Sequence, residues 1–347
     1  MSYFRKLDDE MAQLFSKLDK SQSWLVMINA DPDALASAIA LRRIIRRRVA
    51  HVDIVRINDI FRPDNLAMIH YLRIKNRKYR DRLAERYNKY AIVDSQPHHD
   101  PIFSRFDFSI IVDHHPEKPL PEDRPKPDFM EIRPEYGACS TLFVEYLYSL
   151  KIKPSRQLAT ALFYGIKSDT MSFERDFCDA DIKAFRYLSK FADQNIIRKI
   201  VRNEFPLAWT KYYKQAFDSI TQINGGAFIW MDKVESPDVL VILADFFMRV
   251  QEISWCVVSG RSGRKVVSIF RGDGIRRDVG KLAANCLGHL GGAGGHRTAA
   301  RSEIEIKKFQ GKTPRDIIME RLCDRALRSC STGNTANANN PNNTNQE

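Results

Sequence analysis

The first half of the chain alternates short apolar runs with longer amphipathic segments, and this alternation constrains the fold more than any other feature. The run WLVMI (24–28) precedes a helical pattern over 34–48, and a second apolar run, HVDIVRI (51–57), follows it. This order is typical of a βαβ unit. Further strands are predicted at 90–94 and 108–113, so we expect an α/β fold built on a parallel sheet.

A second, smaller α/β domain is predicted beyond the first. The first domain adds helical patterns at 140–150, 155–166 and 180–201; the second has strand patterns at 225–232, 254–260 and 265–272 and a helical pattern at 237–250. The expected division is a first domain over 1–195, a helical linker over 196–222, a second domain over 223–326 and a disordered tail over 327–347.

Composition excludes some classes of protein and favours a polyanionic partner. The six cysteines form no C-x-x-C pair, which indicates reduced thiols in a cytoplasmic protein rather than a disulfide framework or a structural zinc site. No run of about 18 apolar residues is present, so no membrane partner is expected. The net charge of +12 favours a nucleic acid or a nucleotide as the partner.

Acidic and imidazole side chains follow three of the predicted strands, at the point where each strand ends. Because the carboxyl ends of parallel strands meet at one edge of a sheet, we expect these side chains to converge there. Asp169 follows an apolar helix and is expected to reach the same edge. The residues at the strand ends are Asp31 and Asp33, then Asp94, and then Asp113, His114 and His115.

Each acid also has a simpler interpretation when it is considered alone. Asp33 precedes a helix and is a candidate N-cap, and Asp94 with Ser95 is a candidate Asx turn. Together, however, several carboxylates at one edge would repel each other strongly unless cations bind between them. Oxygen-rich ligands with one or two imidazoles suit Mn²⁺ or Mg²⁺, so a two-metal site is predicted.

The order of these residues resembles that of the DHH phosphoesterase family, which carries D-x-D, a strand-terminal Asp, D-H-H and a later Asp. In addition, the segment GGAGGHRTAA (291–300) is similar to the glycine-rich motif of the DHH-associated C-terminal domain. The resemblance implies a parallel-sheet domain with helices on both faces, a smaller C-terminal α/β domain and a substrate cleft between them.

The resemblance also implies a role for each site residue. Two Mn²⁺ ions are expected, with Mg²⁺ as the alternative. The implied metal ligands are Asp31 on one ion, Asp33, His114 and Asp169 on the other, and Asp94 bridging both. The implied catalytic residues are Asp94, Asp113, His114 and His115, with Asp113 supporting the histidines. The substrate phosphate is expected to contact His115, Arg271, Gly291, Gly292, Gly294, Gly295 and His296.

Two features depart from this assignment. Met27 stands four residues before Asp31, where the family usually has a histidine, and a thioether is a poor ligand for Mn²⁺. A second histidine pair, His98 and His99, follows a turn rather than an apolar strand, so both are expected to be exposed loop residues outside the site, with a stray surface metal site at His99 and Asp100 as the alternative.

The resulting functional hypothesis is a cytoplasmic, Mn²⁺-dependent phosphodiesterase that shortens very short RNA (nanoRNA) to mononucleotides by in-line attack of a metal-bound hydroxide. 3′-Phosphoadenosine 5′-phosphate (pAp) is a second candidate substrate, which would make the enzyme a 3′-nucleotidase as well. The alternatives are a cyclic-dinucleotide phosphodiesterase and, because of Met27, a catalytically impaired nucleotide-binding regulatory protein. A homodimer is an open option.

Overall fold

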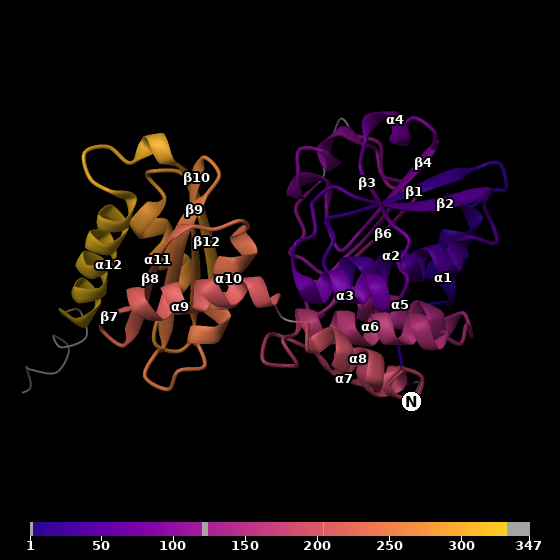
Figure 1. Ribbon diagram of the computed structural model, residues 1–347. Helices are drawn as coiled ribbons and strands as arrows, with labels where there is room; N and C mark the ends of the chain where they lie inside the picture. Colours follow the sequence, from indigo (N-terminus) through magenta and orange to yellow (C-terminus); the bar gives the residue numbers. More distant parts are fainter. Residues whose placement is uncertain (1–2, 120–123, 204, 332–347) are drawn as a thin grey trace, which may run out of the picture. The chain divides into compact units, whose positions relative to one another are not determined.

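The computed structural model describes residues 3–119, 124–203 and 205–331, which form two compact units divided between Phe205 and Pro206. The first unit is drawn in indigo to rose and the second in orange to yellow (Figure 1). The segment 196–222, expected as a helical linker, is shared between the units. Helix α8 (Gln194–Val201) belongs to the first unit and packs against α3 and α6, whereas α9 (Thr210–Ser219) packs against the sheet of the second.

The first unit contains a six-stranded sheet in which every pair of neighbouring strands is parallel. The strands lie in the order β3-β2-β1-β4-β5-β6. Their bounds are β1 (Ser23–Ile28), β2 (His51–Arg56), β3 (Arg77–Lys78), β4 (Lys89–Val93), β5 (Ile110–Asp113) and β6 (Phe129–Ile132). The predicted parallel sheet is confirmed, and the two strands that the sequence patterns did not indicate, β3 and β6, are short and lie at its edges.

Helices cover the two faces of this sheet unequally. Alternate residues of β1 point to opposite faces: Trp24, Val26 and Ile28 pack in the large core with the helices, while Leu25 and Met27 enter a smaller apolar cluster. The large core is built with α1 (Asp8–Ser16), α2 (Pro32–Ile45), α3 (Pro63–Tyr71), α5 (Cys139–Ser149), α6 (Arg156–Asp169) and α7 (Asp179–Ser189). The smaller cluster includes residues of α4 (Asp81–Ala84) and of the 3₁₀ turn η2 (Phe103–Arg105), and η2 contacts a second 3₁₀ turn, η1 (Pro97–His99).

The helical pattern over 180–201 forms two helices rather than one. Helix α7 ends at Ser189, and Asp193 then starts α8 as its N-cap, because its carboxylate accepts hydrogen bonds from the backbone N–H groups of Asn195 and Ile196. The Asp193 backbone N–H also donates to Thr160 Oγ1 of α6, at 2.8 Å. This tertiary contact holds the break in place.

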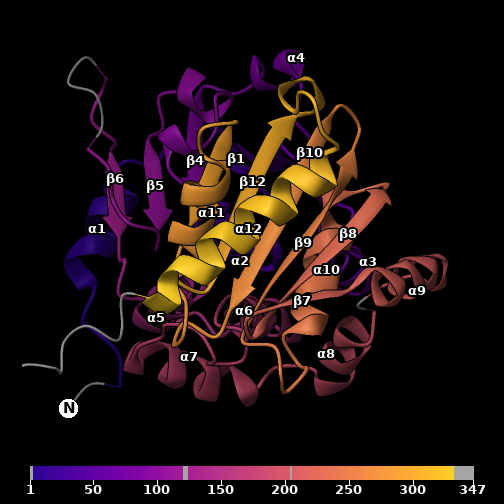
Figure 2. The same cartoon turned by 90° about the vertical axis from the view of Figure 1, so that its left-hand side faces the viewer.

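The second unit is a mixed six-stranded sheet with helices on both faces, as expected for a smaller α/β domain (Figure 2). Only β8 and β9 are parallel neighbours. The strands lie in the order β11 (Gly292–Gly295), β12 (Ala299–Glu305), β10 (Lys265–Gly272), β9 (Trp255–Ser262), β8 (Gly226–Lys233) and β7 (Thr221–Ile223). One face packs on α9 and α10 (Pro237–Phe247), and the other on α11 (Val279–Leu287) and α12 (Pro314–Ser331).

The C-terminal segment differs in part from the expectation. Helix α12 continues to Ser331, so 327–331, predicted as the start of a disordered tail, is helical. The rest of that prediction, 332–347, lies outside the described residues. Within the described part of the chain, no helix is both long and apolar enough to cross a membrane.

Candidate metal centre

The predicted acidic residues lie where the strand order reverses, between β1 and β4. The chain leaves β1 toward β2 on one side and leaves β4 toward β5 on the other, so the loops that follow the two strands diverge. In open parallel sheets, such a switch point forms a crevice at the carboxyl ends of the strands, and ligands bind there. Asp31 follows β1, Asp94 follows β4 and Asp113 ends β5, which brings all three to this crevice.

The two acids of the first motif are held by different contacts. Asp31, not Asp33, is the N-cap of α2: its Oδ1 accepts the Ala34 N–H at 2.9 Å, so the simpler interpretation of Asp33 as the cap is wrong. Asp33 is 1% exposed, and its carboxylate accepts the backbone N–H groups of Cys139 at 2.6 Å and Ser140 at 2.8 Å. The positive end of α5 therefore holds this carboxylate from more than 100 residues away.

Asp94 has a left-handed backbone conformation, with φ at 57°. Most residues avoid this region, but aspartate and asparagine tolerate it better than others. The conformation is supported by a hydrogen bond from the Asp94 N–H to the Val112 carbonyl of β5, at 2.9 Å. The turn directs a buried carboxylate into the crevice instead of letting the chain continue as a strand.

His114 has a free nitrogen for a metal ion. Its Nδ1 lies 3.0 Å from the Tyr136 carbonyl, which can only accept, so the proton of the neutral ring is on Nδ1 and the Nε2 lone pair is available. Nε2 lies 3.0 Å from Asp169 Oδ2 and 3.3 Å from Asp94 Oδ1. Among the described residues, neither Nε2 nor Asp94 Oδ1 has a hydrogen-bond partner of suitable geometry, although both are buried.

Buried polar atoms without a well-formed hydrogen bond, surrounded by carboxylates, fit a cation-binding site. Two overlapping groups, Asp94 with His114 and His115, and Asp33 with His114 and Asp169, each offer ligand atoms within 4.8 Å of one another. The donors are carboxylate oxygens with imidazole nitrogen, a set that suits Mn²⁺ and Mg²⁺. The residues present therefore fit a divalent cation, while the donor set does not identify which one.

The carboxyl groups of the crevice are electrostatically unfavourable without a cation. Burial, reinforced by the charge of Asp169, raises the pKa of Asp31 to about 6 and that of Asp33 to about 7. Burial and the charges of Asp31 and Asp33 raise the pKa of Asp94 well above its usual range. Burial lowers the pKa of His114, but the contacts with Asp169 and Asp94 outweigh this effect and raise it. In the metal-free protein, protons therefore take the place of cations.

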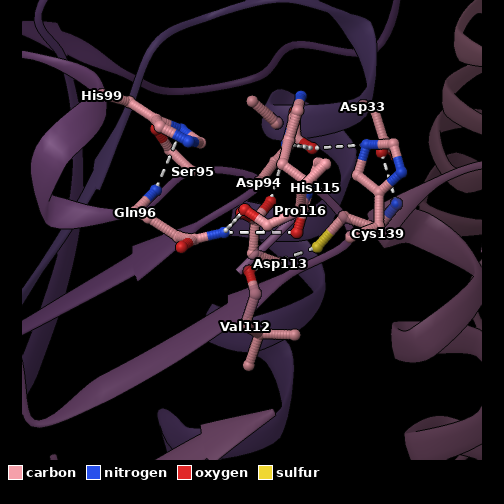
Figure 3. A network of polar contacts seen from close by, with 12 residues as sticks. Asp33, Asp94, Ser95, Gln96, His99, Val112, Asp113, His115, Pro116 and Cys139 are labelled. Carbon is pink, nitrogen blue, oxygen red and sulfur yellow. Dashed lines mark hydrogen bonds and ion pairs between the residues drawn. The ribbon is translucent and has the colours of Figure 1, made fainter. Parts of the chain in front are cut away.

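His115 is oriented by Asp113 and, through it, by Gln96 (Figure 3). Asp113 is buried and accepts a hydrogen bond from His115 Nδ1 at 2.8 Å and from Gln96 Nε2 at 2.7 Å. Burial alone would raise the pKa of Asp113, yet the contacts with His115 and Gln96 lower it to about 2. The His115 side chain is 45% exposed, so its Nε2 is free to meet a substrate.

Met27 is a core residue of the first unit. Its side chain is fully buried in the smaller apolar cluster with Val55 and Ile92, on the face of the sheet opposite α2, α5 and α6. The sulfur is therefore part of the core. At the position where the resemblance implies a histidine, this chain places a packing residue.

The predicted residues of the second unit lie on β10 and on or directly beside β11. Arg271 is 16% exposed and donates from Nε to Asp245 Oδ1 at 2.7 Å, so its charge is already paired. The exposed His296 donates its backbone N–H to the Ala299 carbonyl. The predicted glycines are Gly291, Gly292, Gly294 and Gly295; the last three lie in the edge strand β11, and open space surrounds the Cβ positions of Gly292 and Gly294.

Sequence reasoning missed four contributors to the site. Gln96, the N-terminus of α5 and Gly165 act through tertiary contacts that no local pattern indicates. His99 was expected outside the site, but its ring lies beside His115, with ring centroids 5.3 Å apart, so that expectation is wrong for His99. The only sequence signal was that Gln96 and His99 follow Asp94 closely.

Replacing Gly165 by alanine is expected to weaken metal binding. A Cβ atom at Gly165 would lie 2.5 Å from Ser140 Oγ and 3.0 Å from Asp33 Oδ1, so the Ser140 side chain and the Asp33 carboxylate must shift. We expect a loss of about 1–3 kcal/mol in unfolding free energy and weaker Mn²⁺ binding by calorimetry. Gly292→Ala, whose added Cβ meets no atom within 4 Å, is the control for metal affinity. Unchanged Mn²⁺ affinity in Gly165→Ala would contradict this contact.

Comparison with known proteins identifies the fold. No family model matches the chain. An uncharacterised protein of Methanocaldococcus jannaschii is 32% identical over 306 residues; the match covers 88% of this chain, which spans 62% of the length of that relative. An exopolyphosphatase-related protein from Bacteroides fragilis has a similar structure, with a TM-score of 0.71 at 17% identity, covering 93% of this chain and 97% of the other.

The structure of exonuclease RecJ bound to manganese is also similar, with a TM-score of 0.51 at 13% identity, covering 94% of this chain and 96% of that one. At these identities the likeness shows a shared fold. Both units of the chain take part in it, because the similarity extends over nearly the full length.

Proposed function

We infer that this chain is a member of the DHH phosphoesterase family and that it hydrolyses phosphoric esters at the crevice between β1 and β4. The motifs occur in the family's order, and the chain shares its fold with an exopolyphosphatase-related protein and with an exonuclease. The observation that carries the proposal is a pair of buried atoms, His114 Nε2 and Asp94 Oδ1, which lie 3.3 Å apart among carboxylates and have no hydrogen bond of suitable geometry to any described residue.

In this proposal the acids would divide between two cations. Asp33, His114 and Asp169 would hold one ion, Asp31 would contribute to the other, and Asp94 would contribute to both. When bound, such ions neutralise the carboxylates, lower the pKa of a coordinated water to about 7 and stabilise the charge that develops on phosphate oxygens. We favour Mn²⁺, since the structurally similar RecJ is bound to manganese.

The chain's own residues hold and orient the phosphate. His115 Nε2 points outward while its Nδ1–H is held by Asp113, so the ring can donate to a phosphate oxygen only when Nε2 is protonated. Asp113 fixes the orientation of the ring through this hydrogen bond. The Tyr136 carbonyl keeps the other ring, His114, in the tautomer that a cation requires.

We propose short oligoribonucleotides as the substrate, with pAp as a second candidate and cyclic dinucleotides as the alternative. The net charge of +12 supports a polyanionic substrate. The second unit would contribute β11, where Gly292 and Gly294 leave the backbone accessible to a phosphate or base. Arg271 would have to leave Asp245 before it could bind a phosphate.

A second candidate function, nucleotide binding without turnover, is favoured by one observation. Met27 is buried in the core, so the second ion lacks the ligand that a histidine at this position would supply. With fewer ligands, the site binds that ion with lower affinity. Metal titration distinguishes the two functions. A two-metal enzyme binds two Mn²⁺ ions, whereas a nucleotide-binding protein without turnover would bind one or none.

The test is product analysis by chromatography with Mn²⁺-loaded protein and, separately, pApA, pAp and cyclic di-AMP. Conversion of pApA to AMP, absent in Asp169→Asn, supports the nanoRNA assignment. Cyclic di-AMP as the sole good substrate would replace it with second-messenger hydrolysis. If no ester is cleaved although Mn²⁺ and nucleotide bind, the enzymatic proposal is wrong and the binding function takes its place.

A further inference from the structure

His99 is part of the crevice although it belongs to no motif. It ends the 3₁₀ turn η1, which follows β4 and Asp94, and its ring meets the His115 ring edge to face, with an interplanar angle of 80° (Figure 3). Ligand atoms of His99, Asp113 and His115 lie within 4.8 Å of one another. A second imidazole is therefore available next to the one that faces the phosphate in the proposed function.

The hydrogen bonds of His99 determine which nitrogen carries its proton. The backbone N–H of Gln96 donates to His99 Nδ1 at 3.2 Å, and Ser95 Oγ lies 3.1 Å from the same atom. An N–H group can only donate, so Nδ1 is the acceptor and the neutral ring carries its proton on Nε2. In this arrangement Nε2 offers no lone pair to a cation but offers a hydrogen-bond donor.

One buried residue positions both imidazoles. The Gln96 side chain donates to Asp113, which holds His115, and the Gln96 backbone N–H holds His99. The Gln96 amide also donates to the carbonyls of His115 and Pro116, and its Oε1 accepts the Lys118 N–H. Because Gln96 is 1% exposed and its side chain is fully engaged, the two rings are fixed relative to each other.

We propose that His99 is a substrate-binding residue that donates a hydrogen bond from Nε2 to a phosphate oxygen of the substrate, next to the oxygen contacted by His115. The inference deepens the proposed function and rests on it. Asp33, Asp94 and Asp169 group with His114, whereas His99 groups with Asp113 and His115, so His99 is placed to donate to a phosphate that contacts His115. The neutral His99 ring supplies a further donor there without adding a charge that competes with the cations.

A structural role for His99 makes a different prediction. Accepting the Gln96 N–H closes the turn after β4, and this alone could account for a histidine at this position. Asparagine separates the two roles, because its Oδ1 can take the place of Nδ1 as the acceptor, while the side chain is too short to replace the Nε2 donor. His98→Ala is the matched control, since His98 is the neighbouring exposed histidine of the same turn.

The experiment compares wild type, His99→Asn and His98→Ala, each loaded with Mn²⁺, by calorimetric binding of inorganic phosphate and by kcat/KM for pApA. For His99→Asn we expect phosphate affinity and kcat/KM each to fall about tenfold to a hundredfold, the effect of one hydrogen bond to a charged group. Its Tm and Mn²⁺ affinity should remain those of wild type. His98→Ala should match wild type throughout.

The outcomes separate this inference from the proposed function. Wild-type phosphate affinity and kcat/KM in His99→Asn would overturn the inference while hydrolysis stands. If wild type cleaves no ester but binds phosphate, and His99→Asn weakens that binding, the inference stands and the proposed hydrolysis fails. If the Mn²⁺-loaded wild type neither binds phosphate nor cleaves pApA, both are overturned.

Discussion

Replacing Asp94 with asparagine is expected to reduce phosphoester hydrolysis by about a thousandfold or more and at the same time to stabilise the metal-free protein. Asp94 lies between the two proposed cations, and such sites contribute several kcal/mol of transition-state stabilisation, with 1.36 kcal/mol for each tenfold in rate. Asparagine is the right substitution because it tolerates the φ of 57° at this position, where alanine would add backbone strain.

The gain in stability follows from the raised pKa of Asp94. Burial, Asp31 and Asp33 keep this carboxyl protonated in the folded protein at a pH where the unfolded chain ionises it, which costs folding free energy. Asparagine carries no such cost, so we expect the unfolding free energy of the metal-free protein at pH 7 to rise by about 1–3 kcal/mol. Denaturant unfolding and kcat/KM for pApA measure the two effects.

Asp181→Asn is the matched control for stability. Asp181 is also buried, but its carboxylate accepts hydrogen bonds from the backbone N–H groups of Gly137 and Cys178 and from the Thr141 hydroxyl. The asparagine amide has only one accepting oxygen, because its nitrogen donates. It cannot accept all three hydrogen bonds, so this variant should lose stability. An Asp94→Asn protein with kcat/KM within tenfold of wild type would refute the two-metal assignment.

The metal-free protein is expected to lose stability as the pH rises from about 4 to about 7. The folded pKa values of Asp31, about 6, and Asp33, about 7, lie above the value of about 3.9 in an unfolded chain. In this window the folded state binds more protons than the unfolded state, so the unfolding free energy falls with rising pH. The raised pKa of His114 likewise makes the unfolding free energy fall with rising pH, but at higher pH. The pKa of Asp113 is lowered to about 2, so this group changes the unfolding free energy only below about pH 4.

Mn²⁺ should reverse this trend, because its carboxylate ligands must be deprotonated to bind. The measurement is Tm at pH 5, 6, 7 and 8 with EDTA or with excess Mn²⁺. We expect Tm to fall with pH in EDTA and the Mn²⁺-induced gain to grow, reaching about 3 kcal/mol when the free ion is at a hundred times its Kd. A Tm that rises steadily with pH in EDTA, or a Mn²⁺ gain that shrinks, would contradict the proposed ligand set.

The positions of Asp31, Asp94 and Asp113 at one edge of the sheet were predictable from the sequence. Apolar runs of five or six residues separated by a helical pattern require parallel strands, and parallel strands bring their carboxyl ends together whatever the details of packing. Periodicity is a local property of the chain, so it can be read without the structure. The same reasoning led to the smaller second domain.

Contacts between distant segments were not predictable in this way. The sequence does not indicate that Asp33 meets the N-terminus of α5, that Gly165 must leave room for Ser140, or that Arg271 is paired with Asp245. Each depends on the packing of helices and strands that are far apart along the chain. The break between α7 and α8 was missed for the same reason, since Thr160 contributes to it.

By itself, then, the sequence determined the parallel sheet, the order of its strand-end acids and the resemblance to a phosphoesterase, because apolar periodicity and strand direction decide which ends of the chain segments meet. Only the tertiary structure decided the tautomer and position of the side chains. His114 Nε2 is free to bind a cation, the His99 ring lies beside that of His115, and Met27 packs in the core. These properties depend on hydrogen-bond partners and neighbours that exist only once the chain has folded.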